Sequence, residues 1–197
     1  MVYFLEPKQY NWIRAAGAHE ELLQKQIDGV PLRQSDIPVE TVLKGRLALP
    51  DICKAGNAFR FVSDRAKAAF EELVPGCVAF FPLNLKAPEF MLTSRAFFFI
   101  DVLPRAQLID WDLSPTAPRN IRTSDGRDSR FINGLMTDPT TRFKAVTPDT
   151  PPIWRESDVD RSTVHFFANK KHVFLLDDVW EALNTRFPRQ LVARKLG

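Results

Sequence analysis

The sequence predicts an α+β fold in which a mostly antiparallel or mixed sheet carries a few short helices. Short runs rich in Phe, Ile, Val and Leu, separated by proline or polar breaks, occupy much of residues 78–111 and 142–176. Such short breaks favour antiparallel neighbours, because a parallel crossover needs a dozen or more residues. Good helix patterns are few, and two of them belong to similar strand–cap–helix units.

These two units repeat one design 113 residues apart. Residues 61–76 and 174–189 each run from a strand through an acidic helix start and a two-to-three-turn helix to a proline stop. Ser63 or Asp64 in the first unit, and Asp177 in the second, can serve the free N–H groups of the first helical turn. The best-patterned residues of the chain are therefore expected to build scaffold.

The N-terminal part has weaker patterns. Residues 2–5 predict a first strand, and the helix formers of residues 19–26 followed by Asp28-Gly29 predict a helix and its end. Residues 30–50 read as a proline-punctuated connector with a short strand at 39–43.

The chain beyond the first unit reads as β-rich. Residues 97–100 lack polar alternation, which indicates a central strand covered on both faces. Residues 113–130 are expected to be the least structured stretch, and residues 169–171 a hairpin loop. The expected strands here are residues 78–83, 90–93, 96–102, 107–111, 142–146, 152–155, 163–168, 172–176 and 190–197.

Length and composition suit one domain. We expect residues 1–48 to form an extension packed on the core, and residues 49–197 a single globular α+β unit. A net charge of +3 is too small an excess to indicate nucleic-acid binding by itself. Two cysteines predict no disulfide framework, and the N-terminus has no secretory pattern. Apolar runs fall short of the ~20 residues of a membrane span, so a cytoplasmic protein is expected.

Motifs for several reactions are missing from the sequence. It has no GxGxxG and no Gly-Lys-Ser/Thr to cradle phosphates, and no GxSxG around a nucleophile. Ser63 stands between a strand and a helix without flanking glycines, so we interpret it as a cap. We therefore expect no enzyme and no cofactor.

One metal-dependent alternative stays open. Asp110 and Asp112 are paired carboxylates at alternate positions, and His165 and His172 straddle the expected hairpin, where Asp160 or Asp177 could complete a site. A small metal-dependent hydrolase using Asp110, Asp112 and His165 or His172 is thus the alternative function. The favoured interpretation is a turn at Asp110 that satisfies backbone N–H groups, and no metal.

A basic loop is the best candidate for a partner surface. Arginines interspersed in residues 119–130 could meet an acidic protein or phosphates, but aromatic interleaving is missing until Phe131, which disfavours nucleic acid. Trp154 could be an exposed anchor beside Arg155, although a core position is equally compatible with the sequence. The candidate partner-binding residues are Arg119, Arg122, Arg127, Arg130, Trp154 and Arg155.

From Pro50 onward the order of features resembles the bacterial immunity protein eleven family. Its most diagnostic pieces are a valine-serine-acidic element that enters a helix and an aspartate-x-x-x-serine turn. The segments that carry the resemblance are residues 49–51, 61–66, 78–83, 97–103, 108–114 and 174–183. The motif residues with structural roles are Asp51, Ser63, Asp64, Pro82, Asp110, Ser114 and Asp177.

This resemblance implies a non-enzymatic bacterial protein that binds and neutralises a cognate polymorphic toxin. From the residues themselves we expect no membrane partner, and a homo-oligomer stays open. Specificity in such a protein is expected in loops, which points to residues 113–130 and 151–161.

Overall fold

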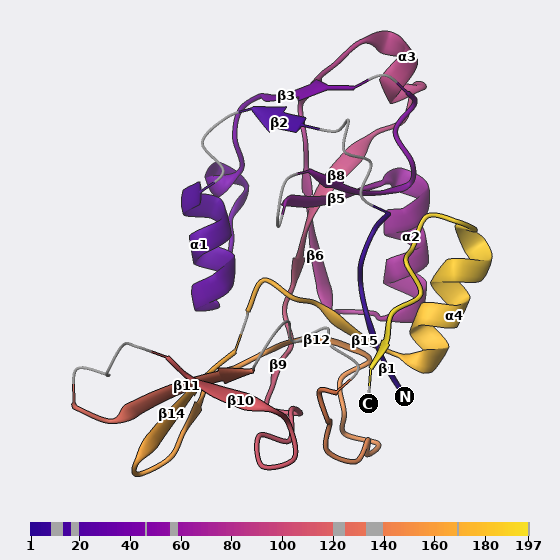
Figure 1. Ribbon diagram of the computed structural model, residues 1–197. Coiled ribbons are helices and arrows are strands. Elements are labelled where there is room, and N and C mark those ends of the chain that lie inside the picture. Colours follow the sequence, from indigo (N-terminus) through magenta and orange to yellow (C-terminus); the bar gives the residue numbers. More distant parts are fainter. Residues whose placement is uncertain are drawn as a thin grey trace.

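The computed structural model describes residues 1–8, 14–16, 20–45, 47–55, 59–119, 125–132, 140–168 and 170–196, with the backbone alone for residues 14–16 and Arg119. Figure 1 shows an elongated molecule with helices α2 and α4 on one side, and both termini lie at its lower end. The described helices are α1 (Glu20–Asp28), α2 (Asp64–Leu73), α3 (Glu89–Leu92) and α4 (Asp177–Arg186). The predicted α+β class, mostly sheet, is confirmed. No described helix is long and apolar enough to span a bilayer.

Four sheets make up the rest of the described fold. In strand order, the first holds β16 (Lys195–Leu196), β1 (Val2–Phe4), β15 (Phe174–Leu176), β12 (Ile153–Glu156) and β9 (Arg105–Ala106). The second holds β4 (Ile52–Ala55), β5 (Phe59–Ser63), β8 (Phe97–Val102) and β6 (Val78–Pro82). The third holds β2 (Arg14–Ala16), β3 (Thr41–Lys44) and β7 (Leu85–Lys86). The fourth holds β10 (Thr116–Arg119), β11 (Asp128–Ile132), β14 (Val164–Phe167) and β13 (Val159–Asp160).

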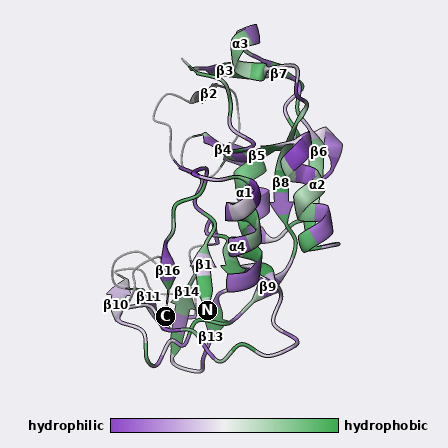
Figure 2. Cartoon of the chain, turned by 90° about the vertical axis from the view of Figure 1, so that its right-hand side faces the viewer, coloured by the Kyte–Doolittle hydropathy of each residue, from purple (hydrophilic) through white to green (hydrophobic). Residues whose placement is uncertain are grey.

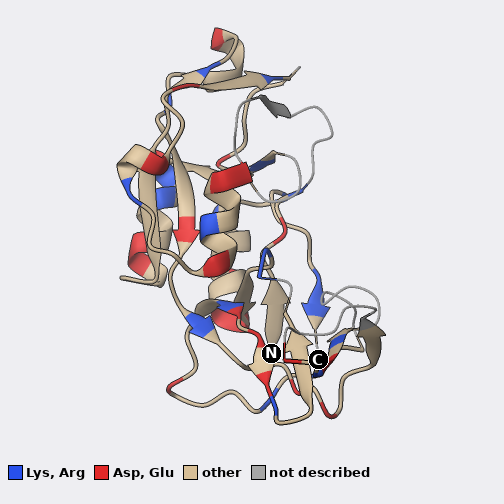
Figure 3. Ribbon diagram, turned by 90° about the vertical axis from the view of Figure 1, so that its left-hand side faces the viewer, with Lys and Arg blue, Asp and Glu red and all other residues tan. Residues whose placement is uncertain are grey.

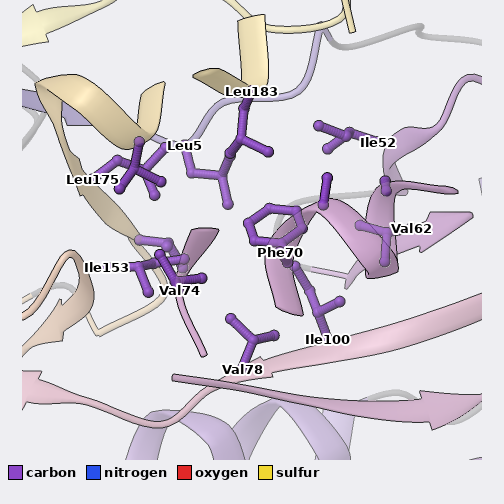
Figure 4. Packing of buried hydrophobic residues seen from close by; sticks show 14 of the residues in the cluster. Leu5, Ile52, Val62, Phe70, Val74, Val78, Ile100, Ile153, Leu175 and Leu183 are labelled. Carbon is purple, nitrogen blue, oxygen red and sulfur yellow. The ribbon is translucent and has the colours of Figure 1, made fainter. Parts of the chain in front are cut away.

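The two predicted strand–helix units are present as β5–α2 and β15–α4. Ser63 caps α2, because its hydroxyl accepts a hydrogen bond from the backbone N–H of Ala66 at 3.3 Å. Helix α4 begins without a side-chain cap but has acidic residues in its first turn. The helices contact each other and share one apolar core, in which Phe70 lies among the side chains that Figure 4 labels.

Strand β8 is the central strand that its apolar run predicts. It pairs antiparallel with β5 on one side and β6 on the other. Phe99 belongs to the core cluster beside β3 and α3, and Ile100 to the cluster beneath α2 and α4. Because both faces are buried, the strand has no solvent side on which polar residues would be favourable.

Helix α1 ends as predicted. The backbone N–H of Val30 donates to the carbonyl of Lys25, and Gly29 has φ +72, a left-handed conformation that glycine adopts without strain. Gln26 is buried and donates to the carbonyl of Ile100, which fastens the helix to β8.

Three expected strands differ in the structure. Residues 90–93 were expected to be extended, but residues 89–92 form the short helix α3, which begins after Pro88 and buries Met91 only. Residues 107–111 and 142–146 meet in one isolated bridge between Ile109 and Phe143 instead of forming full strands. Residues 107–111 do alternate, with Ile109 and Trp111 buried, whereas in residues 142–146 Phe143 is half-buried and its neighbours are exposed.

The segment expected to be least structured contains two strands. β10 and β11 pair antiparallel, and β11 continues into a parallel pair with β14. The expected hairpin around residues 169–171 is wrong, because β14 and β15 belong to different sheets. β15 instead lies between β1 and β12 in the first sheet, where Phe174 and Leu175 are fully buried.

Polarity follows this arrangement. Figure 2 shows hydrophobic residues along the inner strands and on the helices where they meet the sheets. Figure 3 shows acidic and basic residues interspersed along the described chain. The division at residue 48 stays a prediction, although β1 pairs with β15 and β16 from the C-terminal part.

Candidate partner-binding surface

Two of the motif residues meet in a buried polar cluster. Asp51, just before β4, accepts a hydrogen bond from the hydroxyl of Ser63 at 2.6 Å and from Arg95 at 3.0 Å. Gln190 donates to the second carboxylate oxygen of Asp51 at 3.2 Å and accepts from the backbone N–H groups of Asp51 and Ile52. The cluster joins the start of β4, the cap of α2, the segment after α3 and the C-terminal segment.

The charge of Asp51 is well compensated. Burial raises the pKa of this carboxyl, but hydrogen bonds from Ser63 and Gln190 and the charges of Arg95 and Arg65 outweigh it, so the pKa is lowered. An ionised Asp51 is thus the form that the fold stabilises.

The aspartate-x-x-x-serine element is a turn. Asp110 accepts from the backbone N–H groups of Asp112 and Leu113, both at 3.1 Å. The Ser114 hydroxyl accepts from the backbone N–H of Arg142 and donates to its carbonyl, which holds the turn against residues 140–146. The turn interpretation of Asp110 agrees with this geometry.

The remaining motif residues end or begin elements. Pro82 is the exposed last residue of β6. Asp64 and Asp177 are the first residues of α2 and α4. Each therefore marks a boundary in the scaffold.

Two of the predicted partner-binding arginines have described side chains, one in strand β11 of the fourth sheet and one just before it. Arg130 on β11 is exposed and donates to the hydroxyl of Thr116 on β10 at 3.2 Å. Arg127 is held by Asp125 at 2.7 Å and Asp160 at 2.8 Å, so its charge is compensated within the chain. Arg119 lies in β10 with only its backbone described, and Arg122 falls outside the described residues.

Trp154 is not an exposed anchor. Its side chain is fully buried, donates to Glu156 at 2.8 Å and stacks on Phe174 with 5.7 Å between ring centroids. Arg155 is also buried, and it donates to the carbonyl of Lys170 at 3.0 Å. Burial lowers the pKa of Arg155 to about 9. Neither side chain presents a surface to a partner, because Trp154 lies in an apolar core cluster and Arg155 is buried as well.

Comparison with known proteins supports the resemblance that the motifs carry. Residues 5–177 match the model of the Immunity protein family (Imm11). The chain belongs to this family. The match begins further toward the N-terminus than the motif segments do, and so includes part of the segment before residue 48. No curated protein shows significant similarity to the chain.

The residues of the alternative metal-dependent hydrolase contact other protein groups in the structure. Asp112 forms a bidentate pair with Arg161 at 2.7 and 2.9 Å, and His165 contacts Asp160 at 2.5 Å. His172 lies just before β15, and its ring meets the ring of Phe4 edge-on, with 4.8 Å between the two ring centroids. Among the described residues, no three His, Cys, Asp or Glu side chains gather as metal ligands. Asp110 and Asp112 thus share one turn, while His165 and His172 are engaged with Asp160 and Phe4.

Glu156 is a buried charged residue that sequence reasoning missed. Its carboxylate accepts a hydrogen bond from the indole N–H of Trp154. It also accepts from the backbone N–H groups of Leu108 and Ile109, at 3.1 to 3.4 Å. Burial nevertheless raises its pKa to about 7. A signal was available, since Arg155 and Glu156 interrupt a strand that is otherwise apolar. Glu156 holds the segment that leads into the Asp110 turn.

Arg60 is a second buried residue that was missed. Together with Arg155 it donates to the carbonyl of Lys171, at 3.0 and 3.3 Å, which holds the segment between β14 and β15. Burial lowers the pKa of Arg60 to about 10. This pair of buried arginines explains how the chain crosses between two sheets at a place where the sequence suggested a hairpin loop.

Proposed function

We propose that this Imm11 family member neutralises a cognate bacterial polymorphic toxin by binding it in the cytoplasm, without catalysing a reaction. The family match over residues 5–177 is the observation that carries the proposal. The chemistry of the described side chains is compatible with it, since the conspicuous polar residues cap helices, close turns or fill buried clusters.

The fourth sheet is the surface that we favour for the toxin. Arg130 is exposed on β11, and the neighbouring Phe131 is 37% exposed. Consecutive residues of a strand point to opposite faces of the sheet, so Arg130 exposes a charge on one face and Phe131 an aromatic ring on the other; both are residue types that protein interfaces favour. Leu113, next to the Asp110 turn, is 71% exposed and adds apolar area at the start of β10. The proposal therefore retains the loops around residues 113–130 and replaces Trp154 and Arg155 with Phe131 and Leu113.

Co-purification with the product of the adjacent upstream gene tests the function. We expect an untagged toxin domain to elute with the tagged immunity protein in a fixed ratio, and co-expression to restore growth of cells that produce the toxin. A toxin domain carrying a substituted active-site residue allows the pull-down without toxicity. If no neighbouring toxin domain binds and growth is not restored, the proposed function is wrong.

A further inference from the structure

A cleft lies between α2 and α4. Figure 1 shows these two helices on the side of the molecule away from the fourth sheet. The volume of the cleft is about 410 Å³. Ala69 and Phe187 form an apolar floor and are almost fully buried, while Ala68 is exposed. Its lining residues are Arg65, Ala68, Ala69, Glu72, Arg186 and Phe187.

The cleft is the place where the two units depart from each other. Arg186 in α4 occupies the position of Leu73 in α2, which packs against the core. The Arg186 guanidinium instead donates twice to the carboxylate of Glu72, with both distances 2.6 Å. This ion pair forms one wall of the cleft and compensates its own charge.

Arg65 is the charge that the cleft leaves available. Its side chain is 67% exposed, and its nearest carboxylate in the described part of the chain is Asp51 at 3.9 Å. Asp51 already accepts from Ser63 and Arg95, so this contact is secondary. The Arg65 guanidinium lies 5.9 Å from the ring centroid of Phe187, beside the apolar floor. An arginine can donate five N–H groups, and a carboxylate can accept two of them side by side.

We propose that this cleft binds an acidic side chain of a protein partner, with apolar residues on each side of the acid. The carboxylate pairs with Arg65, and the apolar neighbours cover the exposed Ala68 above the buried Phe187. Two arginines against one glutamate give the lining a net positive charge, which matches an acid. A free phosphate would satisfy Arg65 but would leave the exposed side chain of Ala68 uncovered. The inference does not depend on the toxin proposal, because it concerns a different face.

An NMR titration of the full chain tests this site. The probes are two blocked tripeptides, acetyl-Leu-Glu-Leu-amide and its glutamine counterpart. We expect the glutamate peptide to shift the Arg65 side-chain N–H signal and the backbone amides of Ala69 and Phe187, with saturation at roughly millimolar concentration. The glutamine peptide is expected to bind at least about tenfold more weakly, since it lacks the charge.

Matched variants separate the cleft from general charge effects. Arg65→Gln and Ala68→Glu should each abolish the shifts at Ala69 and Phe187, because one removes the cation and the other places a competing carboxylate in the cleft. Lys67→Gln removes the same charge from the other face of α2, where Lys67 lies over the rings of Phe80 and Phe98, and should leave binding unchanged. Equal shifts with both peptides, or equal loss in Lys67→Gln, would overturn the proposal. So would inorganic phosphate that displaces the peptide at an equal or lower concentration, which would mark a small-anion site.

Discussion

The hydroxyl of Ser63 donates to the carboxylate of Asp51 across 2.6 Å while the same hydroxyl accepts from the first turn of α2. One serine therefore caps the helix and ties it to the residue that begins the second sheet. Arg95 and Gln190 complete the shell around Asp51 from 44 and 139 residues away in the chain. The Imm11 motif residues thus stabilise the fold at the point where distant segments meet.

Replacing Asp51 with alanine should destabilise the protein by about 2–4 kcal/mol, because Arg95, Ser63 and Gln190 lose a shared buried acceptor. Asp64→Asn, at the exposed start of α2, is the control and should change the free energy of unfolding much less. Urea denaturation followed by circular dichroism measures both variants. A loss for Asp51→Ala no greater than that for Asp64→Asn would show that the cluster is not important for stability.

Glu156 should make the stability of the protein depend on pH. Its pKa is about 7 in the folded protein against 4.5 for an ordinary glutamate, so the folded state binds more protons between these values. Stability contributed by this group is present at pH 4.5 and is lost as the pH rises to 7, by up to about 3 kcal/mol. Glu156→Gln should remove this fall, whereas Glu20→Gln on the exposed start of α1 should keep it. Identical pH slopes for the wild type and Glu156→Gln would contradict the assignment.

His172 should act in the opposite direction. Burial first, and then the charges of Arg60, Lys54, Arg194 and Arg155, lower its pKa to about 3, against 6.5 for an ordinary histidine. The folded state therefore binds fewer protons than the unfolded state between pH 3 and 6.5, and stability rises with pH across this window.

Substituting His172 with phenylalanine should flatten that rise. The new ring fills the space beside Phe4 and removes a proton-binding group from a cationic environment. The free energy of unfolding of the variant minus that of the wild type should be roughly 2–4 kcal/mol larger at pH 4 than at pH 7. Denaturation curves at both pH values measure this difference. An equal change at the two pH values would mean that His172 does not titrate as its surroundings indicate.

Local patterns predicted the parts of the fold that depend on neighbouring residues. Phe97 to Ile100 predicted a strand buried on both faces, and Ser63 predicted a helix start, because burial and capping act within a few residues. The hairpin at residues 169–171 failed for a long-range reason, since Arg60 and Arg155 hold the carbonyl of Lys171 from other strands. Trp154 was ambiguous for the same reason, because the residues that bury it, among them Phe4 and Phe174, come from distant parts of the chain.

The Asp110 turn and the cleft between α2 and α4 also differ in how far the sequence predicts them. The Asp110 turn depends on bonds between residues two and three positions apart, which the spacing indicates. The cleft between α2 and α4 depends on an ion pair whose members, Glu72 and Arg186, are 114 residues apart. The sequence showed that Arg186 departs from the repeat but could not show which carboxylate it meets.

Reversing the charge of Arg130 should weaken toxin binding if the fourth sheet is the partner surface. Arg130→Glu reverses an exposed charge on β11, and we expect affinity to fall at least about tenfold, with a smaller dependence on salt. Lys86→Glu makes the same charge change on β7, where the side chain is 71% exposed, and should leave affinity nearly unchanged. Calorimetric titration of the inactive toxin domain into each variant measures the effect. Unchanged binding by Arg130→Glu, together with lost binding by Arg65→Gln, would place the toxin at the cleft between α2 and α4.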